Sequence, residues 1–178
     1  MRIVYLCEFG TLLGGERSLL TFLDEVRSQI DIEVVCPATG LLAETLEGRG
    51  IAWRSWPGSA KESALAVGEC LADTGVDLVH ANSLSLASAA VALARRIGCR
   101  CVVHVRDVMG LSARQWEELR KADAVIAVSE AVASFLYQGG INEERVHVVA
   151  NGVTVPKRRE LAAIENLSRP RIACIGQI

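Results

Sequence analysis

Residues 3–16 read Ile-Val-Tyr-Leu-Cys-Glu-Phe-Gly-Thr-Leu-Leu-Gly-Gly-Glu, and this stretch decides the fold. An apolar run, Ile3–Cys7, leads through a glycine-containing loop into an amphipathic segment, 17–26, with apolar residues at helical spacing. A strand, a turn and a helix start in this order place Gly14 and Gly15 beside a helix N-terminus. Unpaired backbone N–H groups and the helix dipole attract an anion there, and glycine lets a phosphate approach the backbone. A Gly-Gly pair alone more often only makes a turn, so the rest of the chain has to decide.

The rest of the chain alternates short Val/Ile-rich runs with longer helical patterns. Strands are predicted at Arg2–Cys7, Ile32–Cys36, Ala52–Ser55, Leu78–His80, Cys101–Val105, Ala124–Val128 and Val146–Val149. Helices are predicted at Glu16–Gln29, Leu41–Gly48, Ala60–Asp73, Leu84–Ile97, Ala113–Lys121 and Glu130–Tyr137. This βαβα alternation predicts an α/β fold, a Rossmann-like three-layer sandwich with a mainly parallel sheet of about seven strands.

Composition bounds the classes of function. The 178 residues are 51% hydrophobic but only 4% aromatic, which suits parallel strands of Val, Ala, Leu and Ile covered by helices. The net charge of −2 and a single compact basic run, 157–159, argue against a nucleic-acid partner. No apolar stretch reaches the roughly 20 residues that span a bilayer, and no secretory leader pattern opens the chain.

Motifs for metals and common cofactors are missing from the sequence. The six cysteines lie mostly inside apolar runs, without metal-ligand spacing to one another or to histidine. The first turn is not G-x-G-x-x-G, and the second predicted strand runs into Cys36-Pro37 rather than an acidic residue. A Walker A lysine, a G-x-S-x-G elbow and an H-E-x-x-H pair are also missing. We therefore expect a cytoplasmic protein, in a reducing compartment, that uses neither metal nor cofactor.

The end of the sequence predicts a domain boundary. Residues 156–170 are charged and read as a linker, whereas residues 171–178 look like a new strand followed by glycine. A domain does not naturally end where such a unit begins. We expect residues 1–155 to be the N-terminal domain of a longer protein and residues 171–178 to open its truncated C-terminal domain.

Polar residues follow the carboxyl ends of five predicted strands. In open parallel sheets, ligands bind outside these ends, so we expect a site there. The residues are Glu8, Gly14, Gly15 and Glu16; His80, Asn82 and Ser83; His104, Arg106 and Asp107; Ser129 and Glu130; and Asn151 and Gly152. Each has a purely structural alternative, such as a helix cap for Ser129, a core histidine for His80 and turns for Asp107 and Asn151. Their coincidence at one sheet edge favours a binding site.

Four short segments carry a resemblance to a known family. They are Gly14–Arg17, Asp77–Ser83, Ala127–Glu130 and Val149–Val153, in this order along the chain. Together they resemble the N-terminal domain of GT-B glycosyltransferases of the large retaining group called family 4. The terminal Ile175-Gly176-Gln177-Ile178 is similar to the first strand of that family's second, donor-binding domain.

The resemblance implies roles for individual residues. Gly14, Gly15 and Asn151 would face the diphosphate of the donor. The family places a histidine just past the fifth strand, near the transferred sugar, often followed by an acid. Here either Arg106 takes that place, with Asp107 as the acid, or His104 does, two residues earlier. The remaining candidates, on the acceptor side or in supporting positions, are Glu16, His80, Asn82, Asp107, Ser129 and Glu130; Asn82 stands where the family has a second histidine.

The implied activity is transfer of a hexose-type sugar from a nucleotide-diphosphate donor to a hydroxyl acceptor, with retention. The acceptor would be a sugar, a lipid-linked sugar or a small molecule. Two alternatives remain open: a nucleotide-sugar epimerase of the same fold, and a binding module without catalysis. The isolated chain is expected to be inactive, because a two-domain transferase forms its site across a cleft. Residues 114–121 mix basic residues with Trp116, but an ordinary surface helix explains them better than membrane contact.

Overall fold

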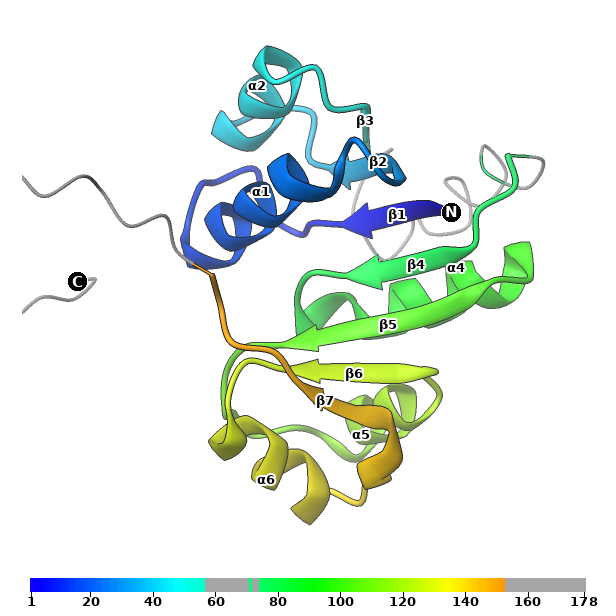
Figure 1. Cartoon of the computed structure of the whole chain (residues 1–178). Coiled ribbons are helices and arrows are strands. Elements are labelled where there is room, and N and C mark those ends of the chain that lie inside the picture. Colours follow the sequence, from blue (N-terminus) through cyan, green and yellow to red (C-terminus); the bar gives the residue numbers. More distant parts are fainter. Residues whose placement is uncertain (57–70, 72–73, 153–178) are drawn as a thin grey trace, which may run out of the picture.

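A single parallel sheet of seven strands forms the centre of the molecule (Figure 1). The computed structural model describes residues 1–56, 71 and 74–152. The strands are β1 (Arg2–Leu6), β2 (Asp31–Cys36), β3 (Trp53–Ser55), β4 (Leu78–Ala81), β5 (Arg100–Val105), β6 (Ala124–Ala127) and β7 (Val146–Val148). They lie in the order β3-β2-β1-β4-β5-β6-β7, and every pairing is parallel. The predicted fold class and all seven predicted strands are confirmed.

Helices connect these strands. They are α1 (Gly14–Val26), α2 (Leu41–Gly48), α4 (Ala87–Ile97), α5 (Ala113–Arg120) and α6 (Glu130–Gln138), with 3-10 turns η1 (Leu84–Leu86) and η2 (Glu143–Arg145). The predicted helix 60–73 lies outside the described residues except for Leu71, which is buried. The predicted linker and terminal strand, 156–178, lie outside them too.

Two helix starts differ from the prediction. Helix α1 begins at Gly14 rather than Glu16, so the glycine pair forms the first helical turn. The predicted helix 84–97 begins with the separate 3-10 turn η1 before α4.

Crossover geometry divides the helices between two faces of the sheet (Figure 1). The chain steps from β1 to β3 in one direction and from β4 to β7 in the other, so right-handed crossovers place the two helix sets on opposite faces. Helices α1 and α2 pack on β1 and β2 through one apolar cluster, which includes Tyr5, Leu23 and Leu46. Helices α4 and α6 pack on β4–β6 through a second cluster, which includes Leu93 and Leu136.

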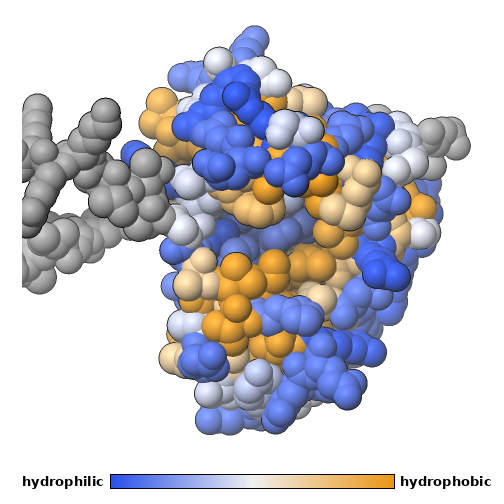
Figure 2. All heavy atoms as spheres, in the orientation of Figure 1, coloured by the Kyte–Doolittle hydropathy of each residue, from blue (hydrophilic) through white to orange (hydrophobic). Residues whose placement is uncertain are grey.

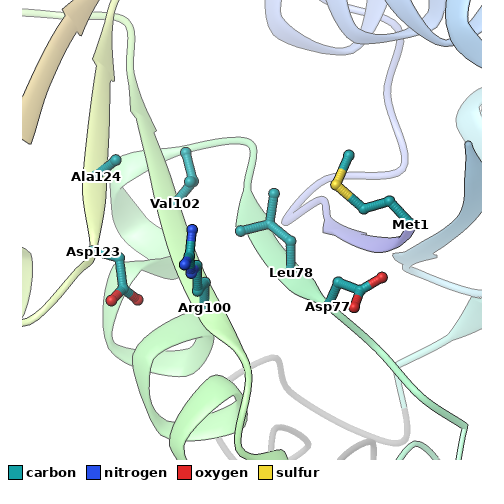
Figure 3. Close-up of a pocket in the computed structure, with 7 residues that line it drawn as sticks. All are labelled: Met1, Asp77, Leu78, Arg100, Val102, Asp123 and Ala124. Atoms are coloured by element: carbon teal, nitrogen blue, oxygen red, sulfur yellow. The ribbon is translucent and has the colours of Figure 1, made fainter.

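One face of β4–β6 therefore carries no helix among the described residues. Burial alternates along these strands: Val79, Val103 and Val125 are fully or almost fully buried, whereas their neighbours on the open face are half-buried. The half-buried residues are Leu78, His80, Val102, His104, Ala124 and Ile126. Figure 2 shows an apolar area on this side of the molecule. At the N-terminal ends of the strands, the open face forms a hollow of about 850 Å³ lined by Leu78, Val102 and Ala124 and flanked by Asp77, Arg100 and Asp123 (Figure 3).

Close backbone contact fixes the loop after β1. A Cβ on Gly10 would lie 2.2 Å from the Thr39 carbonyl oxygen, and one on Gly40 would lie 2.4 Å from the Gly10 oxygen. The Leu42 N–H donates to that same Gly10 oxygen at 2.9 Å. Gly40 has φ +117°, a conformation open mainly to glycine. These contacts hold the loop that leads into α1 against the loop that leads into α2.

Candidate functional site

The N-terminus of α1 lies at the carboxyl ends of the central strands. Leu13 precedes the helix and offers no side-chain cap. The N–H groups of Gly14 and Gly15 find no acceptor within the described part of the chain. Glu16, buried in the same turn, accepts a hydrogen bond from the Leu13 N–H at 3.1 Å. This first turn therefore presents free donors, with one carboxylate close behind them.

Arg106, just past β5, is held in place by neutral acceptors. Its Nε donates to the Asn82 carbonyl oxygen at 3.2 Å, and its Nη2 donates to Asn82 Oδ1 at 2.7 Å. Nη1 donates to Asn151 Oδ1 at 2.8 Å, and Nη2 also reaches His104 Nδ1 at 3.3 Å. These bonds use four of the five guanidinium N–H groups. Within the described residues, no carboxylate forms an ion pair with Arg106.

Gly15, in the first turn of α1, lies directly against Arg106. A Cβ at Gly15 would lie 3.4 Å from Arg106 Nε, a contact at the tight end of the ordinary range. Burial lowers the pKa of Arg106, and the nearby Glu16 carboxylate acts in the opposite direction. An arginine nevertheless stays protonated. The α1 N-terminus and a fixed guanidinium thus lie next to each other, a pairing that suits an anion.

His80 and His104 lie on the open face of β4 and β5, with ring centroids 5.7 Å apart. Arginine can only donate, so His104 Nδ1 accepts, and its neutral ring carries the proton on Nε2. Burial and the Arg106 charge lower the pKa of His80 to about 4 and that of His104 to about 3. The Nε2 atoms of both are buried without a hydrogen-bond partner among the described residues. Both histidines are neutral at pH 7.

Two cavities flank Arg106. The first, about 310 Å³, lies between α1 and the open sheet face and is mostly apolar, with Tyr5, Phe22 and Ile126 in its walls. The second, about 270 Å³, lies among the loops after β1, β4 and β5. It is lined by Glu8, Phe9, Ser83, Leu84, Ser85, Arg106, Asp107 and Met109. The larger hollow of Figure 3 lies at the opposite ends of the strands, away from this cluster.

The structure brings together most of the residues predicted from strand ends. Those that meet around Arg106 are Gly15, Glu16, Asn82, His104 and Asn151, with His80 beside His104. Asp107 is exposed and lines the second cavity. Gly14 is exposed on the outer side of the same turn.

Ser129 and Glu130 stand apart from this cluster. Ser129 Oγ accepts from the Val132 N–H at 3.3 Å and so caps α6, and Glu130 opens that helix. Neither residue lines the two cavities around Arg106. Ser129 thus has the helix-capping role that was its structural alternative.

Sequence reasoning missed several residues near Arg106. Ser18 Oγ donates to Asn151 Oδ1 at 2.9 Å and ties α1 to the segment after β7. Its place one turn after Gly14 was the signal that could have found it. Phe9, Ser85 and Met109 reach the second cavity from loops, where no periodic pattern marks them.

The comparisons with known proteins agree with the fold described above. The profile of Glycosyltransferase Family 4 matches residues 13–156. The fold is similar to that of Anabaena HepE in complex with UDP, with a TM-score of 0.73, 21% identity and 86% of this chain covered. A glycosyltransferase from Rickettsia africae gives 0.72, 18% identity and 85% coverage. The chain covers 44% and 43% of these two structures, and thus spans less than half their length.

Other matches show that the fold alone does not separate activities. UDP-GlcNAc 2-epimerase from Neisseria meningitidis gives a TM-score of 0.60 at 16% identity, with 85% of this chain and 47% of that chain covered. At such identities the likeness establishes the fold only. No curated protein sequence matches the chain significantly.

Two features are missing from the described residues. No group of three or more His, Cys, Asp or Glu side chains there could hold a metal ion. Within the same residues, every helix is too short or too polar to cross a membrane.

Proposed function

The chain belongs to Glycosyltransferase Family 4, and we propose that it forms the acceptor-side half of an enzyme that transfers a hexose-type sugar, with retention, from a nucleotide-diphosphate donor to a hydroxyl group. Several similar structures were solved with UDP or UDP-glucose, which supports a nucleotide-sugar donor. The family match favours a transferase over the epimerases that share the fold.

One observation carries the proposal: a fixed arginine without a carboxylate partner lies beside an uncapped helix N-terminus. In the described residues, Arg106 is bound only by neutral acceptors, and the N–H groups of Gly14 and Gly15 are free. As the bond to the donor sugar breaks, negative charge develops on the departing diphosphate. Donors already in place stabilise that charge without reorganisation, which is the largest contribution in many enzymes.

The two candidates left open by the sequence take different roles. Arg106 offers one remaining N–H and a positive charge, so it would meet the diphosphate. His104 is neutral, its Nδ1 accepts from Arg106 and its Nε2 is buried, so it would help to position the guanidinium rather than touch the sugar. Asn82 and Asn151 would be positioning residues, because they fix the guanidinium.

Binding of UDP to the 178-residue chain tests this proposal. We expect weak binding, on the order of millimolar, because half of a cleft offers few contacts. Arg106→Ala should weaken it about tenfold or more, whereas Arg106→Lys, which keeps the charge but not the fork, should weaken it less. Arg120→Ala, which removes an exposed arginine of α5 that donates to the Gly139 carbonyl oxygen and lines neither cavity beside Arg106, is the matched control. Equal UDP binding by wild type and Arg106→Ala would refute the proposal.

We also expect no measurable sugar transfer by the chain alone. Losing a single well-placed hydrogen-bond donor can reduce the rate by roughly 10²–10³. One half of the cleft lacks the donors that the other half would supply. Product analysis with a panel of nucleotide sugars would detect transfer or hydrolysis, and robust turnover would show that the site is complete within these 178 residues.

A further inference from the structure

Large apolar side chains are exposed on two loops at the edge of the candidate site. Phe9, in the loop after β1, is 54% exposed, and Met109, in the loop after β5, is 50% exposed. Both line the second cavity beside Arg106. Isolated exposed apolar residues are ordinary, but two from separate loops that line one cavity point to a ligand with an apolar face.

Apart from Arg106, the polar lining of this cavity is acidic and hydroxylic. Ser85 Oγ donates to the Glu8 carboxylate, and the hydroxyls of Ser83 and Ser85 are hydrogen-bonded to each other at 2.8 Å. Asp107 lines the same cavity. Carboxylates accept hydrogen bonds from hydroxyl groups and repel phosphate and carboxylate groups. Arg106 is the cation of this lining, but four of its five N–H groups are already bonded and two carboxylates, Glu8 and Asp107, oppose its charge, so the lining favours a neutral ligand rich in hydroxyls.

We propose that this cavity binds the acceptor as a neutral sugar ring, with the ring's C–H face against Phe9 and Met109 and its hydroxyls toward Glu8, Ser85 and Asp107. A sugar ring combines these two properties: its C–H groups form an apolar face that suits the negative face of an aromatic ring, while hydroxyls surround its rim. The proposal rests on the proposed function and names the class of its acceptor.

Size and position support a single ring. The volume of about 270 Å³ lies just below the roughly 300 Å³ at which drug-sized pockets begin, so it suits one ring better than a long lipid chain. Arg106 forms part of both this cavity and the cluster at the α1 N-terminus. An acceptor hydroxyl in the cavity would therefore lie next to the place proposed for the donor diphosphate.

Methyl glycosides of glucose, galactose and mannose are suitable probes for the 178-residue chain. Ligand-observed NMR should detect weak binding of at least one of them, in the millimolar range. Phe9→Ala should reduce that affinity at least fivefold, and Glu8→Gln should reduce it as well. Phe22→Ala is the matched control, because this aromatic side chain is 48% exposed but lines the first cavity instead.

Several outcomes would overturn the inference. They are the absence of binding by every glycoside, equal binding by wild type and Phe9→Ala, a loss confined to Phe22→Ala, and preference for a sugar phosphate over the neutral glycoside. UDP binding separates this inference from the proposed function. Phe9→Ala should leave UDP affinity unchanged, whereas failure of Arg106→Ala to weaken UDP binding would refute the proposed function whatever the glycosides do.

Discussion

Strands β1 and β2 are buried on both faces, whereas β4, β5 and β6 are buried on one. From Ile3 to Leu6 every residue of β1 is buried, because α1 packs on one face and the second apolar cluster covers the other. In β5, buried Val103 and Val105 alternate with half-buried Val102 and His104. In sequence, both sets of strands are mostly apolar. The difference shows that crossover direction, rather than residue type, decides which strand faces are covered.

The same comparison explains where polar chemistry can sit. Histidines occupy the open face at His80 and His104, and both adjoin the cluster around Arg106. Strands β1 and β2, which are covered on both faces, hold no half-buried histidine. The buried charged residue of β2, Glu33, forms ion pairs with Arg2 and Arg54. Incomplete cover leaves His80 and His104 half-buried beside Arg106, a position that the fully covered strand β1 does not offer.

The largest expected effect comes from a charge placed on either face of one strand. Val103→Asp puts a carboxylate into the covered core and should lower the free energy of unfolding by about 3–5 kcal/mol, because the charge is buried and unpaired. Val102→Asp, one residue earlier on the open face, should lower it by less than about 1.5 kcal/mol. Urea unfolding at pH 7 measures both. Equal losses would show that the open face is packed as tightly as the covered one.

A second prediction concerns the glycine contact in the covered half. Gly40→Ala should lower the free energy of unfolding by about 2–4 kcal/mol, since its Cβ would clash with the Gly10 oxygen and φ +117° is strained for alanine. Gly48→Ala is the control in the same segment. It has open space around its Cβ and should be neutral or stabilising by up to about 1 kcal/mol. Thermal unfolding of the two variants should rank Gly40→Ala well below Gly48→Ala, and the reverse order would contradict the loop packing.

Much of this architecture follows from the sequence, because periodicity fixes which segments are strands and topology then follows from crossover rules. The strand-end rule also selected Gly15, Asn82, Arg106 and Asn151, which the fold brings together. A position at a strand end does not by itself say whether a residue caps a helix, as Ser129 does, or lines a cavity, as Asp107 does. The rule did not find Phe9 and Met109. Loop side chains are positioned by backbone contacts such as that of Gly10 with Gly40, and such contacts leave no periodic pattern in the sequence.

The open-face histidines predict a dependence of stability on pH. Their pKa values, about 4 for His80 and about 3 for His104, lie below the roughly 6.5 of an unfolded chain. The unfolded state therefore binds protons first. Stability is complete above pH 6.5 and falls as pH drops from 6.5 toward 4, by about 1–3 kcal/mol per histidine.

A series of unfolding curves between pH 7 and pH 4 measures this slope. His80→Phe should flatten it by removing one titrating group, although the variant can differ in stability at pH 7. His104→Gln should flatten it as well. Parallel curves for wild type and both variants would show that carboxylates alone produce the acid sensitivity.

The smallest effect should separate two helix N-termini at the same edge of the sheet. Helix α6 is capped by Ser129, whereas α1 begins after Leu13 and has no side-chain cap. Ser129→Ala should lower the free energy of unfolding by about 1 kcal/mol, as loss of a cap does, and leave UDP binding unchanged. Ser112→Ala, which removes the cap of α5, is the matched control and should behave alike. A drop in UDP affinity for Ser129→Ala but not for Ser112→Ala would place the α6 N-terminus in the ligand site. The free N–H donors of α1 would then no longer set its N-terminus apart from that of α6.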